Sequence, residues 1–210
     1  MTNLELTYVG DPMCSWCYGF APQWEQVRAA LRPEVRVSWV QGGLAPDSDE
    51  PMPEELRAYV QGAWRAVRER TGVEFNWAFW EECEPRRSTY PACRAVLAAE
   101  ALRPGATPAM FDRIQRAYYA EARNPSDAQT LVGCAVDLGL EADAFAQALA
   151  APATQAALER DFARRDALGA SGFPSLIGRA GERVELLARG WAPAAEVLRA
   201  VDALAPGSVG

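Results

Sequence analysis

The chain contains no histidine, and this absence excludes several kinds of catalysis. Histidine is the most frequent general base in enzymes, and it completes the Ser-His and Cys-His pairs that activate a nucleophile. It is also the usual zinc ligand apart from cysteine. A nucleophile in this protein must therefore be activated by its position in the fold.

Lysine is absent as well, so all 21 basic residues are arginine, and the formal net charge is −7. No run of basic residues offers a nucleic-acid footprint, and phosphates repel an acidic chain. We therefore expect no nucleic-acid partner. Neither a GxGxxG motif nor a P-loop is present, which argues against a nucleotide cofactor.

Long apolar runs are missing too, because none approaches the ~18 residues of a spanning helix. The N-terminal stretch MTNLELTYVGD lacks the basic start and the apolar stretch of a secretory signal. We therefore expect a cytoplasmic protein with no membrane partner. In that reducing compartment five cysteines rarely form a structural disulfide framework, and an odd number leaves one over.

The predicted elements indicate an α/β fold that is interrupted by helices. Alternating and helical apolar spacings predict strands at 4–10, 35–43, 174–178 and 183–190, and helices at 14–31 and 193–204. The first three elements form a strand–helix–strand unit, which implies a parallel pair of strands.

The stretch between the second and third strands is predicted to be helical, with six helical segments between residues 53 and 168. The resulting order β-α-β, helices, β-β-α is that of a thioredoxin fold with a large helical insertion. We predict a thioredoxin-like domain made of residues 1–50 and 170–210, with residues 51–169 as the inserted helical domain.

Two cysteines three positions apart, Cys14 and Cys17, lie where the first strand gives way to the first helix. The unpaired N–H groups and the positive dipole end of a helix favour a thiolate there. A thiolate attacks disulfides, and a second thiol one turn later can displace the mixed disulfide. We assign Cys14 as the nucleophile and Cys17 as the resolving thiol.

Two other interpretations of this cysteine pair have less support. A zinc site needs further ligands, and Cys83, Cys93 and Cys134 form no second closely spaced pair, so we expect no metal. Burial in the core is common for lone cysteines, but a CxxC motif that opens a helix after a strand is typical of redox proteins.

The second half of the site is predicted in the segment GASGFPSLIG. Pro174 begins a strand that would be central, and proline occurs in central strands only at the start. We predict a cis Phe173–Pro174 bond that faces Cys14, with the backbone of Phe173 offered to a substrate strand. The alternative is an ordinary loop proline.

Five stretches together resemble the cytoplasmic DsbA-like thiol oxidoreductases, namely DPMCSWCYGF, QGGLAP, YPACRAVLAA, QRAYYAEARNPSD and GFPSL. The resemblance covers essentially the whole chain and is nearest to the branch of predicted protein-disulfide isomerases, with FrnE-type proteins as relatives. It implies a thioredoxin fold with a helical insertion, a redox-active Cys14–Cys17 pair and a cis-Pro174 loop.

Four residues are candidates for auxiliary roles. Trp16 would give a substrate an apolar contact, Asp11 would cap the helix, and Glu25 would accept a proton from Cys17. Cys93 stands where FrnE-type relatives have histidine, so it would be a third thiol near the site. The alternatives are packing for Trp16, a solvated position for Glu25 and core burial for Cys93.

The sequence thus predicts a thiol:disulfide oxidoreductase or isomerase that acts on protein, peptide or small-molecule disulfides. It would need a cytoplasmic thiol reductant and no cofactor, with glutathione as an alternative co-substrate. Kappa-class glutathione transferases and 2-hydroxychromene-2-carboxylate isomerases share the predicted architecture but have serine where this chain has Cys14. A non-enzymatic peptide-binding holdase is the third interpretation.

Overall fold

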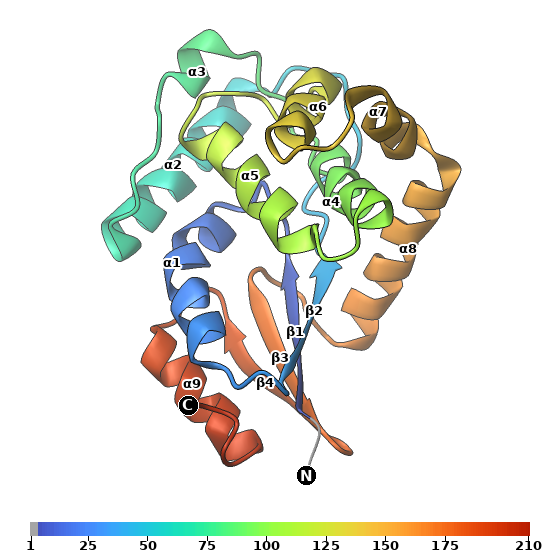
Figure 1. The fold of residues 1–210 in the computed structure, drawn as a ribbon. Coiled ribbons are helices and arrows are strands. Elements are labelled where there is room, and N and C mark those ends of the chain that lie inside the picture. Colours follow the sequence, from blue (N-terminus) through green and yellow to red (C-terminus); the bar gives the residue numbers. More distant parts are fainter. Residues whose placement is uncertain (1–3) are drawn as a thin grey trace.

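The computed structural model describes residues 4–210, in which a four-stranded sheet is surrounded by helices (Figure 1). The strands are β1 (Leu4–Gly10), β2 (Arg36–Gln41), β3 (Ser175–Ala180) and β4 (Arg183–Arg189), in the sheet order β2-β1-β3-β4. β1 and β2 are parallel, and the other two pairs are antiparallel. The predicted thioredoxin fold is confirmed, although Pro174 lies just before β3 and not within it.

Two helices complete the thioredoxin-like part, and the others lie between β2 and β3. The helices are α1 (Ser15–Ala30), α2 (Glu54–Thr71), α3 (Phe79–Glu82), α4 (Tyr90–Leu102), α5 (Thr107–Tyr119), α6 (Ala128–Asp137), α7 (Ala142–Ala150), α8 (Pro152–Ala167) and α9 (Ala194–Leu204). The short α3 was not expected from the apolar spacing. Every helix within the described residues is too short or too polar to cross a lipid bilayer.

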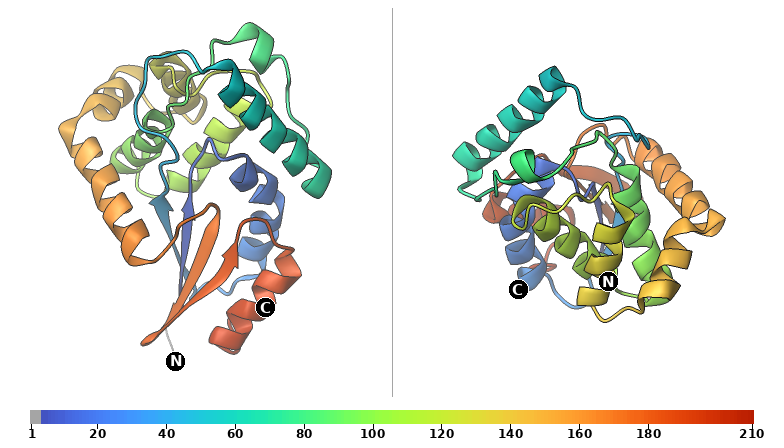
Figure 2. Two further views of the ribbon diagram at one scale, coloured as in Figure 1. Left: turned by 180° about the vertical axis from the view of Figure 1, so that it is seen from behind. Right: turned by 90° about the horizontal axis from the view of Figure 1, so that it is seen from above.

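The helices form layers around the sheet. α1 and α9 lie together on one side of it, whereas α8 covers β2 from the other side (Figures 1 and 2). Helices α2 to α7 gather beyond the end at which β1 and β2 finish. The insertion therefore lies over the sheet edge from which α1 starts.

β1 is buried except at Glu5, because it is a central strand covered on both sides. Its residues alternate between the two faces. Leu6 and Tyr8 join the large core that includes residues of α1 and α9, whereas Val9 packs with Val40 and Ile177 on the other face. Apolar residues on both faces of β1 thus contribute to the packing on both sides of the sheet.

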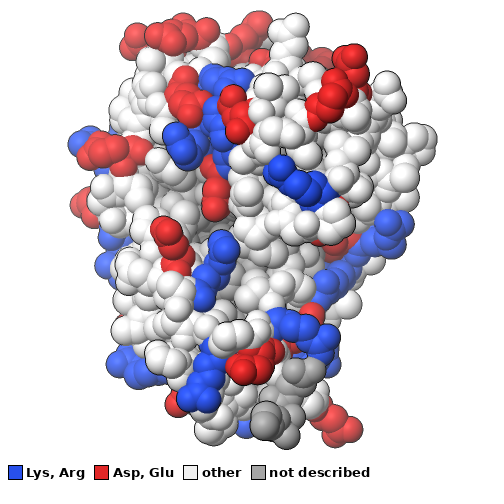
Figure 3. Space-filling view, viewed as in Figure 1, with Lys and Arg blue, Asp and Glu red and all other residues white. Residues whose placement is uncertain are grey.

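Arginines on the insertion pair with acidic residues of neighbouring helices and loops. The guanidinium of Arg113 lies 2.7 Å from carboxylate oxygens of both Glu121 and Asp137. Acidic and basic side chains are interspersed over the face shown in Figure 3. The carboxylates of these pairs are partly exposed, and surface pairs each contribute at most about 1 kcal/mol, so apolar packing dominates the stability of the insertion.

The insertion has an aromatic core centred on Trp64 of α2, which is fully buried. The ring centroids of Phe75, Trp80, Tyr119 and Tyr118 lie 5.0 to 5.4 Å from that of Trp64. Aromatic side chains bury a large apolar area, and tilted pairs at this distance add a further favourable interaction. The packing of α2, α5 and the segment around α3 thus depends on one side chain.

We expect Trp64→Ala to reduce the free energy of unfolding by about 3–5 kcal/mol, because it leaves a large cavity among these rings. Urea denaturation followed by circular dichroism measures the change. Tyr59→Ala on the same helix is the matched control, since Tyr59 is 71% exposed and its loss should change stability by less than about 0.5 kcal/mol. A loss below about 1 kcal/mol for Trp64→Ala would show that this cluster is not the core of the insertion.

Candidate functional site

The two cysteines occupy the junction between β1 and α1. Cys14 is the residue before the first turn of α1, with an extended backbone, and Cys17 lies within that turn. The backbone N–H of Cys14 donates to the carbonyl of Asp11 at 2.9 Å, which closes the connecting turn. Cys14 therefore sits among the unpaired amides of a helix N-terminus, as the sequence predicts.

The two thiols differ in their access to solvent. Cys17 is completely buried, whereas 6% of Cys14 is exposed. Burial raises the pKa of the Cys17 thiol well above its usual range, and its hydrogen bond and charge interaction with Cys14 raise it further. Only Cys14 can meet an incoming disulfide, and Cys17 stands behind it.

The segment before β3 lies against the outer cysteine. The Cys14 thiol donates to the carbonyl oxygen of Phe173, with Sγ and O 3.6 Å apart. The Phe173–Pro174 peptide bond is cis, and the half-buried ring of Phe173 packs on Gly42, where an added Cβ would lie 2.6 Å from Cζ. The structure thus brings Phe173 and Pro174 to Cys14, over a separation of 159 residues.

The expectation that Asp11 caps α1 is wrong, because no side chain of residues 4–210 caps the start of that helix. Its Oδ1 accepts from the N–H of Met13 at 2.7 Å, which makes a local turn. Its Oδ2 accepts from the N–H of Leu44 and from the hydroxyl of Thr89, both at 2.7 Å. The fully buried carboxylate therefore joins the end of β1 to the loop after β2 and to the start of α4.

Cys93 belongs to this hydrogen-bond group and not to the cysteine pair. Its Sγ lies 3.6 Å from Oδ2 of Asp11, and the residue is completely buried. Burial and the charge of Asp11 raise the pKa of the Cys93 thiol well above its usual range. Cys93 is therefore a protonated donor to Asp11, which matches the core-burial alternative.

Glu25 lies away from the cysteines, which contradicts its predicted role as a proton acceptor for Cys17. Its exposed side chain lines a groove of about 520 Å³ between α1 and α5, together with Arg28 and Asp112. The prediction was wrong because it used only the position of Glu25 two turns after Cys17, and this spacing does not show which face of α1 its neighbours cover. Trp16 is half-buried and packs against the core.

The structure adds Thr89 and Tyr8 to the surroundings of the site. Thr89 holds Asp11, and Tyr8 of β1 lies next to Cys17 beside Gly10. The alternation of β1 could have placed Tyr8 on the face that α1 covers. Within residues 4–210, no three histidine, cysteine, aspartate or glutamate side chains come together as a metal site.

Comparisons with known proteins agree with the thioredoxin fold described above. The family model described as a DSBA-like thioredoxin domain matches residues 5–193. A proposed protein disulfide isomerase from Nitrosomonas europaea superimposes with a TM-score of 0.85 at 30% identity, over 96% of this chain and 97% of that one. The cytosolic disulfide reductase DsbM from Pseudomonas aeruginosa superimposes with a TM-score of 0.74, also at 30% identity, over 88% and 89% of the two chains.

One curated protein with a similar sequence is described as an adapter and not as an oxidoreductase. The ClpXP adapter protein SpxH of Halalkalibacterium halodurans is 24% identical over 162 residues, which is 75% of this chain. The match spans 53% of the length of that relative. The structures from N. europaea and P. aeruginosa are matched over nearly their whole length, so they are the better guides to this site.

The unequal burial of the thiols predicts an order of alkylation in the reduced protein. At pH 7.5 iodoacetamide should modify Cys14 at least about tenfold faster than Cys17, since each unit by which a thiol pKa is raised removes about nine-tenths of its thiolate. Peptide mapping by mass spectrometry gives the two rates. The half-buried Cys83 is replaced by serine to remove its competing reaction. Faster modification of Cys17 would reverse the assigned roles.

Proposed function

Because the chain belongs to the DSBA-like thioredoxin domain family, we propose that it is a thiol:disulfide oxidoreductase whose redox pair is Cys14 and Cys17. One observation carries the proposal: an outer thiol at a helix N-terminus touches the segment before β3, and an inner thiol lies one turn behind it. This arrangement supplies the attacking and resolving groups of disulfide exchange.

The reaction proceeds in two exchanges. Cys14 loses its proton, and its thiolate attacks one sulfur of a substrate disulfide. A mixed disulfide forms, and the other substrate sulfur leaves as a thiolate and takes up a proton. Cys17 then loses its proton and attacks Sγ of Cys14. The Cys14–Cys17 bond forms, the bond to the substrate breaks, and the second substrate sulfur leaves and takes up a proton. The substrate gains two electrons and two protons.

The substrate would approach along the segment before β3. The backbone of Phe173 lies next to the Cys14 sulfur, so an extended peptide bound there would place its disulfide at the nucleophile. The small exposed fraction of Cys14 favours flexible peptides and small disulfides over rigid protein surfaces. Trp16 lies between the two cysteines in the chain and would add apolar contact.

Glutathione is the reductant that we propose for the oxidised pair, and we place the reaction in the cytoplasm. The P. aeruginosa DsbM structure has also been determined with GSH, and it superimposes on this chain with a TM-score of 0.71 at 30% identity. A small tripeptide thiol can reach a sulfur that is largely covered. One glutathione would attack Sγ of Cys14 and release Cys17, and a second would attack the mixed disulfide, so that Cys14 is released and oxidised glutathione leaves.

The direction of electron flow is proposed from a structural relative. The P. aeruginosa protein DsbM, which is described as a cytosolic disulfide reductase, superimposes on 88% of this chain at 30% identity. We therefore propose that this protein also acts as a disulfide reductase and not as an oxidant.

The roles of the two cysteines are tested by trapping. Cys17→Ser should accumulate mixed disulfides through Cys14, because no thiol remains to release the bound partner. Non-reducing electrophoresis of the variant, purified after acid quenching and alkylation, shows the adducts. Cys14→Ser is the matched control and should trap nothing. Equal trapping by both variants, or by neither, would count against the mechanism and would favour a holdase.

The reduction potential tests the proposed direction. Equilibration of the Cys14–Cys17 pair with glutathione buffers should give about −220 to −270 mV, within the range of glutaredoxins and thioredoxin. Differential alkylation followed by mass spectrometry measures the oxidised fraction at each ratio. A value near about −120 mV, as in a strong oxidant, would contradict the reductase assignment.

A further inference from the structure

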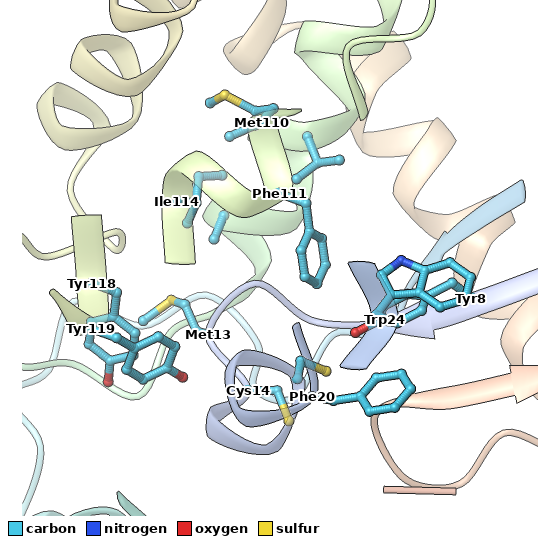
Figure 4. Close-up of a cluster of buried hydrophobic side chains, with 14 of the residues drawn as sticks. Tyr8, Met13, Cys14, Phe20, Trp24, Met110, Phe111, Ile114, Tyr118 and Tyr119 are labelled. Atoms are coloured by element: carbon cyan, nitrogen blue, oxygen red, sulfur yellow. The ribbon is translucent and has the colours of Figure 1, made fainter. Parts of the chain in front are cut away.

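Tyr8 is a buried phenol held beside the inner thiol. The residue is 1% exposed, and the rings of Trp24, Trp39 and Phe111 enclose it, with centroids 5.1, 4.5 and 5.9 Å from its own. Figure 4 shows the hydroxyl of Tyr8 pointing toward the start of α1, where Cys14 lies. The surrounding rings leave the hydroxyl little freedom to turn elsewhere.

Gly10 allows the phenol and the thiol to lie together. A Cβ placed on Gly10 would be 2.6 Å from Cε1 of Tyr8 and 3.2 Å from Sγ of Cys17. Any larger residue would therefore displace the two side chains. The edge of the Tyr8 ring next to its hydroxyl and the sulfur of Cys17 therefore lie on the same side of Gly10, and both residues are buried.

The groups that act on the pKa of Cys17 include no cation. Besides burial, Cys14 and the charge of Asp11 raise this pKa, and a backbone hydrogen bond with Asp11 lowers it. A side-chain donor would stabilise the Cys17 thiolate further. Burial raises the pKa of Tyr8 well above its usual range, and the charge of Cys17 and a hydrogen bond with it raise that pKa further. Tyr8 therefore remains a neutral O–H donor at any pH at which the protein works.

We propose that Tyr8 is a further catalytic residue, whose hydroxyl donates a hydrogen bond to the Cys17 thiolate during resolution of the mixed disulfide. The inference rests on the proposed function, because it assigns a group to the second exchange. Tyr8 keeps its proton throughout. The proton of Cys17 leaves with the departing substrate thiolate, the Cys14–Cys17 bond forms, and the bond from Cys14 to the substrate breaks.

This role predicts a selective defect in the second exchange. A hydrogen bond to an ionised acceptor is stronger than one to a neutral acceptor, so Tyr8 stabilises the thiolate of Cys17 more than its thiol. Loss of the hydroxyl should raise the apparent pKa of resolution by about one unit and slow it roughly tenfold at pH 7.5. Attack by Cys14 should be unaffected.

Stopped-flow reaction of the reduced protein with Ellman's reagent separates the two exchanges, in a background in which Cys83 is serine. The first release of thionitrobenzoate reports attack by Cys14, and the second reports resolution by Cys17. The test compares Tyr8→Phe with wild type between pH 6 and 9. Tyr119→Phe is the matched control, since Tyr119 is also fully buried and its hydroxyl has no hydrogen-bond partner in the described part of the chain.

The expected result is a second phase that is slowed about tenfold in Tyr8→Phe with its pH midpoint shifted upward, while the first phase and the control variant match wild type. An unchanged second phase would overturn the role of Tyr8 and leave the proposed function standing. Equal slowing of both phases would mean a structural role and would also overturn the inference. A wild-type protein without any second phase would overturn both proposals.

Discussion

The buried carboxylate of Asp11 is the interaction on which the site depends. It lies at the end of β1, with no exposure to water, and it accepts hydrogen bonds from Leu44, Thr89 and Cys93 as well as from its own turn. Burial raises its pKa, and the hydrogen bonds, led by that from Thr89, act against this rise. A buried acceptor with several donors fixes the segments that carry them, because a lost partner would leave a polar group unpaired in the interior. The turn that presents Cys14 is thereby attached to the sheet and to the insertion at once.

The same junction gives the two thiols different environments. Cys14 lies at the helix N-terminus against the carbonyl of Phe173, whereas Cys17 faces inward toward the core. The outer sulfur can meet a partner, and the inner one is reached only by the outer one. A dithiol built in this way favours the cycle of attack and release over permanent capture. The phenol of Tyr8 and the inner sulfur both lie beside Gly10, in the interior behind Cys14.

Much of this architecture could be predicted from the sequence, because the decisive signals are local. Strand alternation over residues 4–10, the CxxC spacing and a proline at the start of a central strand each depend on neighbouring residues. The predictions for Asp11 and Glu25 failed because the surroundings of these side chains are formed by residues that are distant in the sequence. The partners of Asp11 lie 33 and 78 residues away, on a loop and a helix whose positions no local pattern specifies. Glu25 satisfied the helical spacing, but its exposed side chain lines the groove between α1 and α5.

The central claim is that Cys14 and Cys17 form one redox pair, and disulfide mapping tests it most directly. The reduced protein is incubated with oxidised glutathione, quenched with acid, alkylated and digested, and its peptides are identified by mass spectrometry. The account predicts an internal Cys14–Cys17 disulfide, with Cys93 and Cys134 recovered as alkylated thiols. A lasting glutathione adduct on Cys14 without the internal bond, or a bond from Cys14 to another cysteine, would contradict it.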